Sequence, residues 1–96
     1  MKILAFFGNE SGPRSYDFGT HTTANNVVGK MLSDLKNSDS RYFRVDFRNL
    51  TTAVRFIKNL KNAAVDLEKI ITISMVVTNV NSVIEVFVDM DKPRNA

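Results

Sequence analysis

The last third of the chain holds two apolar segments, Ile70–Thr78 and Val83–Met90, joined by the short polar link Asn79–Ser82. Both segments alternate their side chains with a period of two and are rich in β-branched residues, which favour pleated strands. Two such strands on either side of a short polar link predict an antiparallel β-hairpin. A β-sheet is therefore part of the fold.

The rest of the chain alternates strand and helix patterns. Apolar residues repeat at i, i+3, i+4 and i+7 in two segments, which predicts two amphipathic helices whose first turns threonines can cap. Residues 8–21 include three glycines and a proline and are interpreted as a long loop, and 91–96 as a polar tail. The predicted elements are a strand over Lys2–Phe7, a helix from Thr22 or Thr23 to about Lys36, a strand over Arg41–Arg48, and a helix from Thr51 or Thr52 to about Leu67.

This order, β-α-β-α-β-β, predicts an α+β fold that forms a single domain over residues 1–96. Right-handed crossovers between successive strands place both helices on the same face of the sheet. The simplest architecture is a two-layer sandwich, in which two helices cover a mixed four-stranded sheet that ends in the C-terminal hairpin. Because 44% of the 96 residues are hydrophobic, the chain can bury a core without covalent or metal cross-links.

The chain contains no cysteine, which excludes a disulfide framework, a thiolate metal site and a cysteine nucleophile. Its first segment, Met1–Gly8, carries one charged side chain and a short apolar run. That run is too brief for a secretory signal or a membrane span. We therefore expect a soluble, cytoplasmic protein that does not associate with a membrane.

Catalytic and metal-binding patterns are missing from the sequence. His21 is the only histidine and the acidic residues are scattered, so no metal site is predicted. Ser15 and Asp17 are the nearest candidates for a triad with His21, but Ser15 lacks the sharp turn that presents a nucleophilic serine. We expect no enzymatic activity and no cofactor.

A strand, a glycine-containing loop and a helix N-terminus can together bind an anion, because unpaired helix N–H groups and the helix dipole favour phosphate. The candidate residues for such an anion-binding loop are Gly8, Gly12, Arg14 and Thr22. The segment lacks the Gly-Lys-Ser/Thr and Gly-x-Gly-x-x-Gly patterns of nucleotide-binding loops. A sensor of phosphate or of a nucleotide is the weakest of three functional hypotheses.

Positive charge is concentrated in the middle of the chain. The net charge is +3, and residues 41–69 alone hold seven basic and three acidic side chains, a local net charge of +4. Aromatic side chains that stack on bases and arginines that pair with phosphates would suit a nucleic-acid-binding domain. The residues of this alternative are Tyr42, Arg44, Arg48, Arg55, Lys58 and Lys61, with Phe87 as a second stacking residue. Acidic residues nearby, and a strand order unlike that of the common RNA-binding sheet, weigh against it.

One face of the predicted sheet is left over. The helices are expected to cover one alternating set of strand residues, which in the first hairpin strand is Ile71, Ile73, Met75 and Val77. The opposite face keeps an unusual apolar component, and its candidate protein-interaction residues are Phe87, Tyr42, Val76 and Glu85. Monomers rarely expose such a patch to water. Three explanations are open: the 8–21 loop or the tail folds over this face, a homodimer buries it, or a partner binds it.

The leading hypothesis is a small, non-catalytic protein-binding regulator or inhibitor. It would act through the leftover sheet face, the edge of the hairpin or the 8–21 loop, and an exposed hairpin edge makes a homodimer plausible. The chain has ten asparagines and many lysines, a bias that is common in AT-rich genomes such as those of many phages. The concrete form of the hypothesis is a phage-encoded protein that acts on a host protein.

Overall fold

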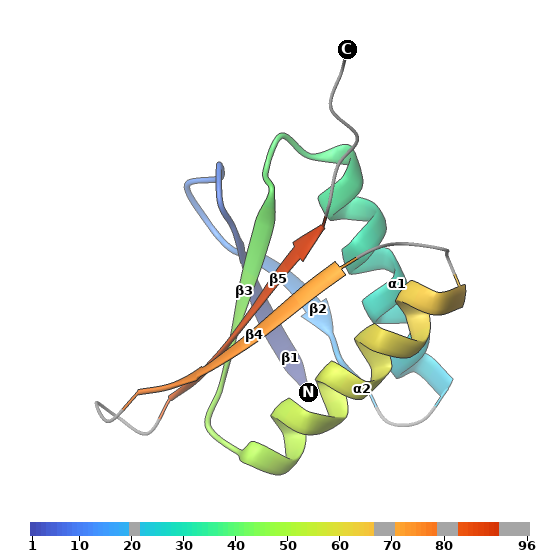
Figure 1. The fold of residues 1–96 in the computed structure, drawn as a ribbon, viewed down its shortest axis with the longest axis vertical. Coiled ribbons are helices and arrows are strands. Elements are labelled where there is room, and N and C mark those ends of the chain that lie inside the picture. Colours follow the sequence, from blue (N-terminus) through green and yellow to red (C-terminus); the bar gives the residue numbers. More distant parts are fainter. Residues whose placement is uncertain (20–21, 67–70, 79–82, 91–96) are drawn as a thin grey trace.

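The computed structural model describes residues 1–19, 22–66, 71–78 and 83–90, which form two helices and a five-stranded sheet (Figure 1). The predicted α+β class is confirmed. The described elements, in chain order, are β1 (Lys2–Phe7), β2 (Arg14–Asp17), α1 (Thr22–Asn37), β3 (Tyr42–Phe47), α2 (Leu50–Asp66), β4 (Ile71–Val77) and β5 (Ile84–Met90).

The sheet differs from the predicted one in strand number and direction. Its order is β2-β1-β3-β5-β4, and every neighbouring pair is antiparallel, so the expected mixed four-stranded sheet is wrong in these two details. The extra strand is β2, which lies inside the segment 8–21 that the sequence predicts to be a loop. Tyr16 faces the core within β2, and Phe18 is also buried just after it.

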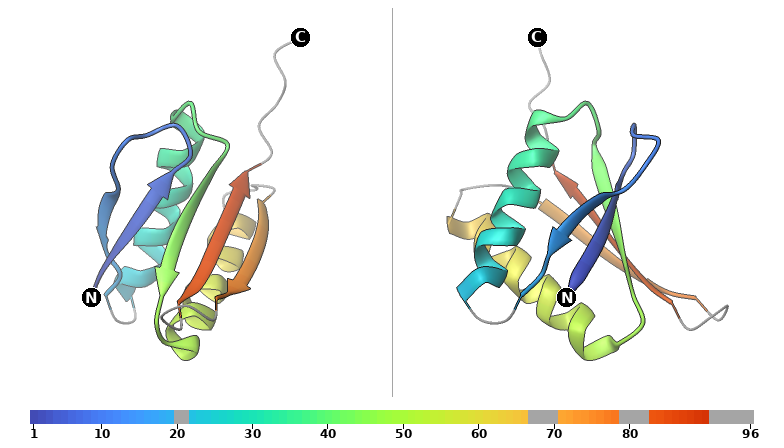
Figure 2. Two further views of the ribbon diagram at one scale, coloured as in Figure 1. Left: turned by 90° about the vertical axis from the view of Figure 1, so that its left-hand side faces the viewer. Right: turned by 180° about the vertical axis from the view of Figure 1, so that it is seen from behind.

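The strand β2 also changes how the helices connect the sheet. It reverses the chain after β1, so α1 links β2 to β3 while β1 lies between these two strands. In the same way α2 links β3 to β4 around β5. Both crossovers leave their helix on the same side, and Figure 2 (left) shows the two helices behind the sheet, with α2 behind β5 and β4. The predicted two-layer arrangement is confirmed.

The core lies between the helices and the sheet. Phe56 of α2 is its centre, because its fully buried ring contacts Phe18 edge-on at 5.5 Å and Phe47 at 5.1 Å between ring centroids. Phe7 and Phe43 make a further ring contact at 5.4 Å across β1 and β3. Together with buried residues of α1, these aromatic side chains belong to one cluster that joins the two helices to the central strands.

The second helix begins one residue before the predicted start because Asn49, rather than a threonine, caps it. The amide oxygen of Asn49 accepts a hydrogen bond from the backbone N–H of Thr52 at 3.2 Å. Its backbone carbonyl accepts one from the N–H of Ala53 at 3.1 Å. Asparagine is among the preferred residues for this position, since its side chain satisfies a helix N–H that has no partner within the helix.

The C-terminal hairpin is confirmed, with Ile71 opposite Met90 and Val77 opposite Ile84. However, the Val77 end of β4 runs beyond the helices (Figure 1). Met75 and Val77 are therefore 44% and 62% exposed, and the expectation that the helices cover them is wrong. Only Ile71 and Ile73 of this alternating set pack against the core.

Several expectations fall outside the part of the chain that the structure describes. These are the link 79–82, the tail 91–96, and the placement of His21 and Leu67. Of the described residues, neither helix combines the length and the apolar composition that crossing a membrane requires.

Candidate protein-interaction surface

The face of the sheet opposite the helices is the main candidate surface, and Figure 2 (left) shows it toward the viewer. No described element lies over it: the 8–21 segment, one of the candidates to cover this face, instead forms β2 and extends the sheet at its edge. We call the side chains of this side the open face. The open face is made of Lys2, Leu4, Phe6, Ser15, Asp17, Tyr42, Arg44, Asp46, Thr72, Ser74, Val76, Glu85, Phe87 and Asp89.

The centre of the open face is a row of cross-strand neighbours. Phe6 of β1 lies opposite Arg44 of β3, which lies opposite Phe87 of β5, which lies opposite Ser74 of β4. The Arg44 guanidinium stacks over the Phe6 ring, 4.7 Å from its centroid. Aromatic side chains thus flank the arginine on both sides, a composition that is enriched at the energetic centres of protein interfaces.

Two carboxylates balance the charge of Arg44. Its Nε lies 3.0 Å from Oδ1 of Asp46 and 3.8 Å from Oε2 of Glu85. Nε is buried, and within the described residues neither approach has the geometry of a hydrogen bond. The sheet register places Asp46 directly opposite Glu85, so the positive charge of Arg44 beside both carboxylates offsets the repulsion between them.

Replacing Arg44 by alanine is expected to lower the free energy of unfolding by about 1 kcal/mol, because Asp46 and Glu85 then face each other without a counter-charge. All three side chains are partly exposed, so the effect stays small and shrinks in high salt. Urea unfolding of Arg44→Ala and of the double variant Arg44→Ala/Glu85→Gln measures it. The second substitution is expected to restore part of the loss, because it removes one of the two facing charges. An equal or larger loss in the double variant would contradict it.

Tyr42 lies at the border of the open face, beside the Phe7 end of β1. Its ring lies 6.2 Å from that of Phe87 between centroids and is 39% exposed. The ring also occupies the space beside Gly8, where a Cβ atom would come within 2.7 Å of Cε1 of Tyr42. The backbone N–H of Gly8 donates to the carbonyl of Tyr42 at 3.0 Å, so glycine at position 8 permits this close approach.

A hollow of about 500 Å³ opens at the other end of the open face. The register that joins β1 to β3 covers only Ala5–Phe7, and the hollow lies beyond it, toward the start of β1. Leu4, Phe6 and Phe47 form apolar walls, and Arg48 lines it beside the first turn of α2. Leu4 is 46% exposed there. A hollow of this size with apolar walls can receive an anchoring side chain of a partner.

The charges of the open face favour a partner other than a polyanion. On β3 and β5 this face holds one basic residue, Arg44, and three acidic ones, Asp46, Glu85 and Asp89, a net charge of −2.

No protein-family model, curated protein or solved structure matches the chain. Functional inference therefore depends on the geometry and chemistry of the surface itself.

The residues of the nucleic-acid alternative do not share one surface. Tyr42 and Arg44 lie on the open face with Phe87. Arg55, Lys58 and Lys61 lie on α2, which covers the other side of the sheet (Figure 2), and the Arg55 guanidinium stacks over Phe18 at 4.8 Å. Arg48 lies between these sets, at the hollow.

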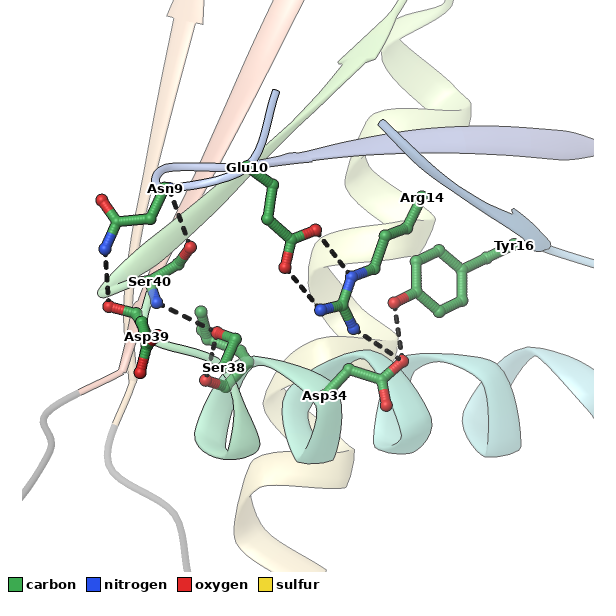
Figure 3. Close-up of polar contacts among 9 residues, drawn as sticks. Asn9, Glu10, Arg14, Tyr16, Asp34, Ser38, Asp39 and Ser40 are labelled. Atoms are coloured by element: carbon green, nitrogen blue, oxygen red, sulfur yellow. Dashed lines mark hydrogen bonds and ion pairs between the residues drawn. The ribbon is translucent and has the colours of Figure 1, made fainter. Parts of the chain in front are cut away.

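The candidate anion-binding residues are also dispersed. Gly8 lies under the Tyr42 ring and Gly12 is exposed in the turn before β2. Arg14 belongs to β2 and is already engaged (Figure 3): Glu10 accepts two hydrogen bonds from it, at 2.8 and 2.5 Å, and Asp34 of α1 lies 3.8 Å away. Thr22 begins α1.

The contacts of Arg14 attach β2 to α1. The guanidinium also stacks over the Phe7 ring at 4.4 Å. Figure 3 shows the Tyr16 hydroxyl, which donates to Oδ2 of Asp34 at 2.7 Å. The hydrogen bonds from Arg14 lower the pKa of Glu10, and Glu10 in turn raises the pKa of Arg14. This network accounts for Arg14 as a structural residue of the β2–α1 contact.

The environment of Tyr16 predicts a loss of stability in alkaline solution. Burial, followed by the hydrogen bond to Asp34, raises the pKa of Tyr16 above its ordinary value of 10.0. The folded state therefore keeps the phenol neutral where the unfolded chain ionises it. The stability that this provides is complete below pH 10 and falls above it, by at most about 1.4 kcal/mol per pH unit.

The measurement is urea unfolding of the wild-type chain and of Tyr16→Phe from pH 8 to pH 11. At pH 8 the wild-type chain is expected to be about 1–2 kcal/mol more stable, because it keeps the hydrogen bond to Asp34. Above pH 10 this difference is expected to shrink, since only the wild-type chain can ionise residue 16. A difference that stays constant across this range would contradict the role assigned to Tyr16.

Two parts of the candidate surface were absent from the sequence interpretation. The hollow beside Leu4 arises where β1 and β3 stop pairing, and no local sequence pattern predicts where the pairing ends. Asp17 and Ser15 join the open face only because β2 is a strand.

Among the described residues, no group of histidine and acidic side chains is arranged to hold a metal ion.

Proposed function

We propose that the protein is a non-catalytic protein-binding module whose open face is the binding surface. The observation that carries the proposal is the uncovered row Phe6–Arg44–Phe87, bordered by Tyr42 and by the hollow at Leu4. Aromatic and arginine side chains that are preorganised on a sheet supply large contact area at low entropic cost. A regulator or inhibitor of another protein, including a phage protein directed at a host protein, is the form of this function that we favour.

The chemistry of the open face specifies its partner. Apolar or aromatic side chains of the partner would seat against Phe6, Phe87 and the hollow. Because the β3 and β5 part of this face has a net charge of −2, lysine or arginine on the rim of the partner complements it. The proposed partner surface is therefore apolar in the centre and basic at the rim.

The experiment is affinity capture with three immobilised baits: the wild-type chain, Leu4→Asp and Asn62→Asp. Both substitutions add one negative charge at an exposed position, but Leu4 lies on the open face and Asn62 on the outer side of α2. A protein that wild-type and Asn62→Asp retain and Leu4→Asp loses supports the proposal. Partners that all three baits retain, or that Asn62→Asp alone loses, would contradict it.

Nucleic-acid binding remains the alternative, and it has a separate test. Fluorescence anisotropy of labelled single- and double-stranded oligonucleotides is measured at low and at moderate salt. Our proposal predicts flat curves. Tight binding that weakens steeply with salt, through release of counterions, would instead favour a role for Arg55, Lys58 and Lys61 on α2.

A further inference from the structure

We infer that the protein forms a homodimer through β4, whose outer edge pairs with β4 of a second copy in antiparallel fashion. β4 is the last strand of the sheet order, so its far edge has no strand beside it among the described residues. Its sequence, Ile-Thr-Ile-Ser-Met-Val-Val, contains no charged residue, proline or glycine. Edge strands usually carry such residues because they prevent pairing with another chain, and β4 lacks them.

The phase of the hairpin shows which backbone groups reach the free edge. The N–H of Thr78 donates to the carbonyl of Val83 at 2.9 Å, which makes this pair a hydrogen-bonded one. In an antiparallel ladder such pairs alternate with pairs that do not bond to each other. Backbone groups directed away from β5 therefore belong to Ile71, Ile73, Met75 and Val77.

These four residues define one symmetric register. When two copies of β4 pair antiparallel about Ser74, Ile73 lies opposite Met75 of the second copy and Ile71 opposite Val77. Every outward backbone group within β4 then bonds to a group of the second copy. A register shifted by two residues would instead place Ile71 or Val77 opposite a residue outside β4. The side chains on the helix side match apolar against apolar, and no like charges meet.

The flank of α2 beside the same edge supports a second copy as the occupant. Val54 and Val65 are mostly exposed and follow a stripe beside the buried one, in which Ile57 is half-buried and Lys61 also lies. Phe56 and Arg55 contact Phe18 just after β2, so this stripe lies on the flank of α2 that faces away from β2, toward β4 at the other end of the sheet. Figure 2 (left) shows α2 on the β4 side of α1.

Two-fold pairing of antiparallel edge strands keeps the same face of both sheets on one side. The two copies of α2 would then approach each other over the joined sheet and cover these stripes. The second copy would cover the exposed apolar side chains of α2 and β4. Stable interfaces bury about 800 Å² per partner, and the edge backbone and the half-buried isoleucines also contribute to the buried area.

The absence of cysteine from the chain permits a register-specific test. In the proposed dimer Ser74 lies opposite Ser74 of the second copy, in a non-hydrogen-bonded pair about 4.5 Å apart between Cα atoms. This spacing suits a disulfide. Thr72 and its counterpart lie four residues out of register, about 13 Å apart. Under mild oxidation the Ser74→Cys chain is expected to form at least about tenfold more disulfide-linked dimer than the Thr72→Cys chain. Equal cross-linking of the two variants, or none, would overturn the register.

Analytical ultracentrifugation tests the dimer itself. The wild-type chain is expected to sediment at twice its 10.8 kDa mass. Met75→Pro removes an outward N–H without breaking the β4–β5 ladder, and it is expected to be a folded monomer whose far-ultraviolet circular dichroism matches that of the wild-type chain. Leu4→Asp, on the open face, is expected to stay dimeric, so failure of the dimer and failure of partner binding are separable. A wild-type monomer, or a dimer that survives Met75→Pro and dissociates in Leu4→Asp, would overturn the inference.

Discussion

The Phe87→Asp chain is expected to fold and to lose its partner. Phe87 lies at the centre of the open face between Arg44 and Ser74, and the Tyr42 ring contacts it. Central aromatic residues of an interface commonly contribute 2 kcal/mol or more to binding, so the dissociation constant is expected to rise by about 30-fold or more. Titration calorimetry with the captured protein measures this change.

The fold should tolerate Phe87→Asp because the new carboxylate faces the Arg44 side chain across the β3–β5 pair. Phe87 is only half-buried, so the expected loss in the free energy of unfolding is about 1–2 kcal/mol. Asn62→Asp, which adds the same charge on the helix layer, is the matched control and should bind as the wild-type chain does. An unfolded Phe87→Asp chain would show that Phe87 belongs to the core and would remove the basis for the proposed surface.

The Phe56→Ala chain is expected to lose about 3–5 kcal/mol of stability, the largest effect of any single substitution that we predict. Phe56 is fully buried, and its ring contacts both Phe18 and Phe47. Its removal leaves a cavity where α2, β3 and the segment after β2 meet. Small domains have only about 5–15 kcal/mol of stability, so this single substitution would remove a substantial fraction of it.

Phe56→Leu is the control for Phe56→Ala, because leucine keeps most of the buried volume and loses only the ring geometry. Its expected cost is about half that of Phe56→Ala. Urea unfolding followed by far-ultraviolet circular dichroism gives both values. Similar small losses for the two variants would show that α2 does not depend on Phe56 for its attachment to the sheet.

The strongly periodic parts of the fold could be predicted from the sequence. The alternation over Ile70–Thr78 and Val83–Met90 predicted the hairpin, and the helical stripes predicted α1 and α2 to within a residue or two at the ends that the structure describes. The alternation Phe43, Val45, Phe47 correctly assigned the buried side of β3. In each case one face is apolar over several turns or pleats, and burial of that face selects the structure.

The rest depended on contacts that no local pattern contains. Residues 14–17 offer only Tyr16 as an apolar residue within the strand, and their pairing with β1 makes them β2. Once β2 reverses the chain, all the neighbouring strands become antiparallel, although the helices still lie on one face. The exposure of Met75 and Val77 follows from the length of β4 relative to α2, which is a property of the packed molecule.

The candidate surface was only partly predictable for the same reason. Alternation alone placed Tyr42, Glu85 and Phe87 on the open face, where the structure has them. The stacking of Arg44 on Phe6 required the register of β1 against β3. The separation of Arg55, Lys58 and Lys61 from this face required knowing which side of the sheet α2 covers.

The most direct test of the proposed surface is amide chemical-shift mapping of the ¹⁵N-labelled chain as the captured partner is added. Our account predicts that the perturbed amides cluster at the open face, around Phe6, Arg44 and Phe87, and beside the hollow at Leu4. Perturbations confined to the outer sides of α1 and α2, with the open face unchanged, would contradict it.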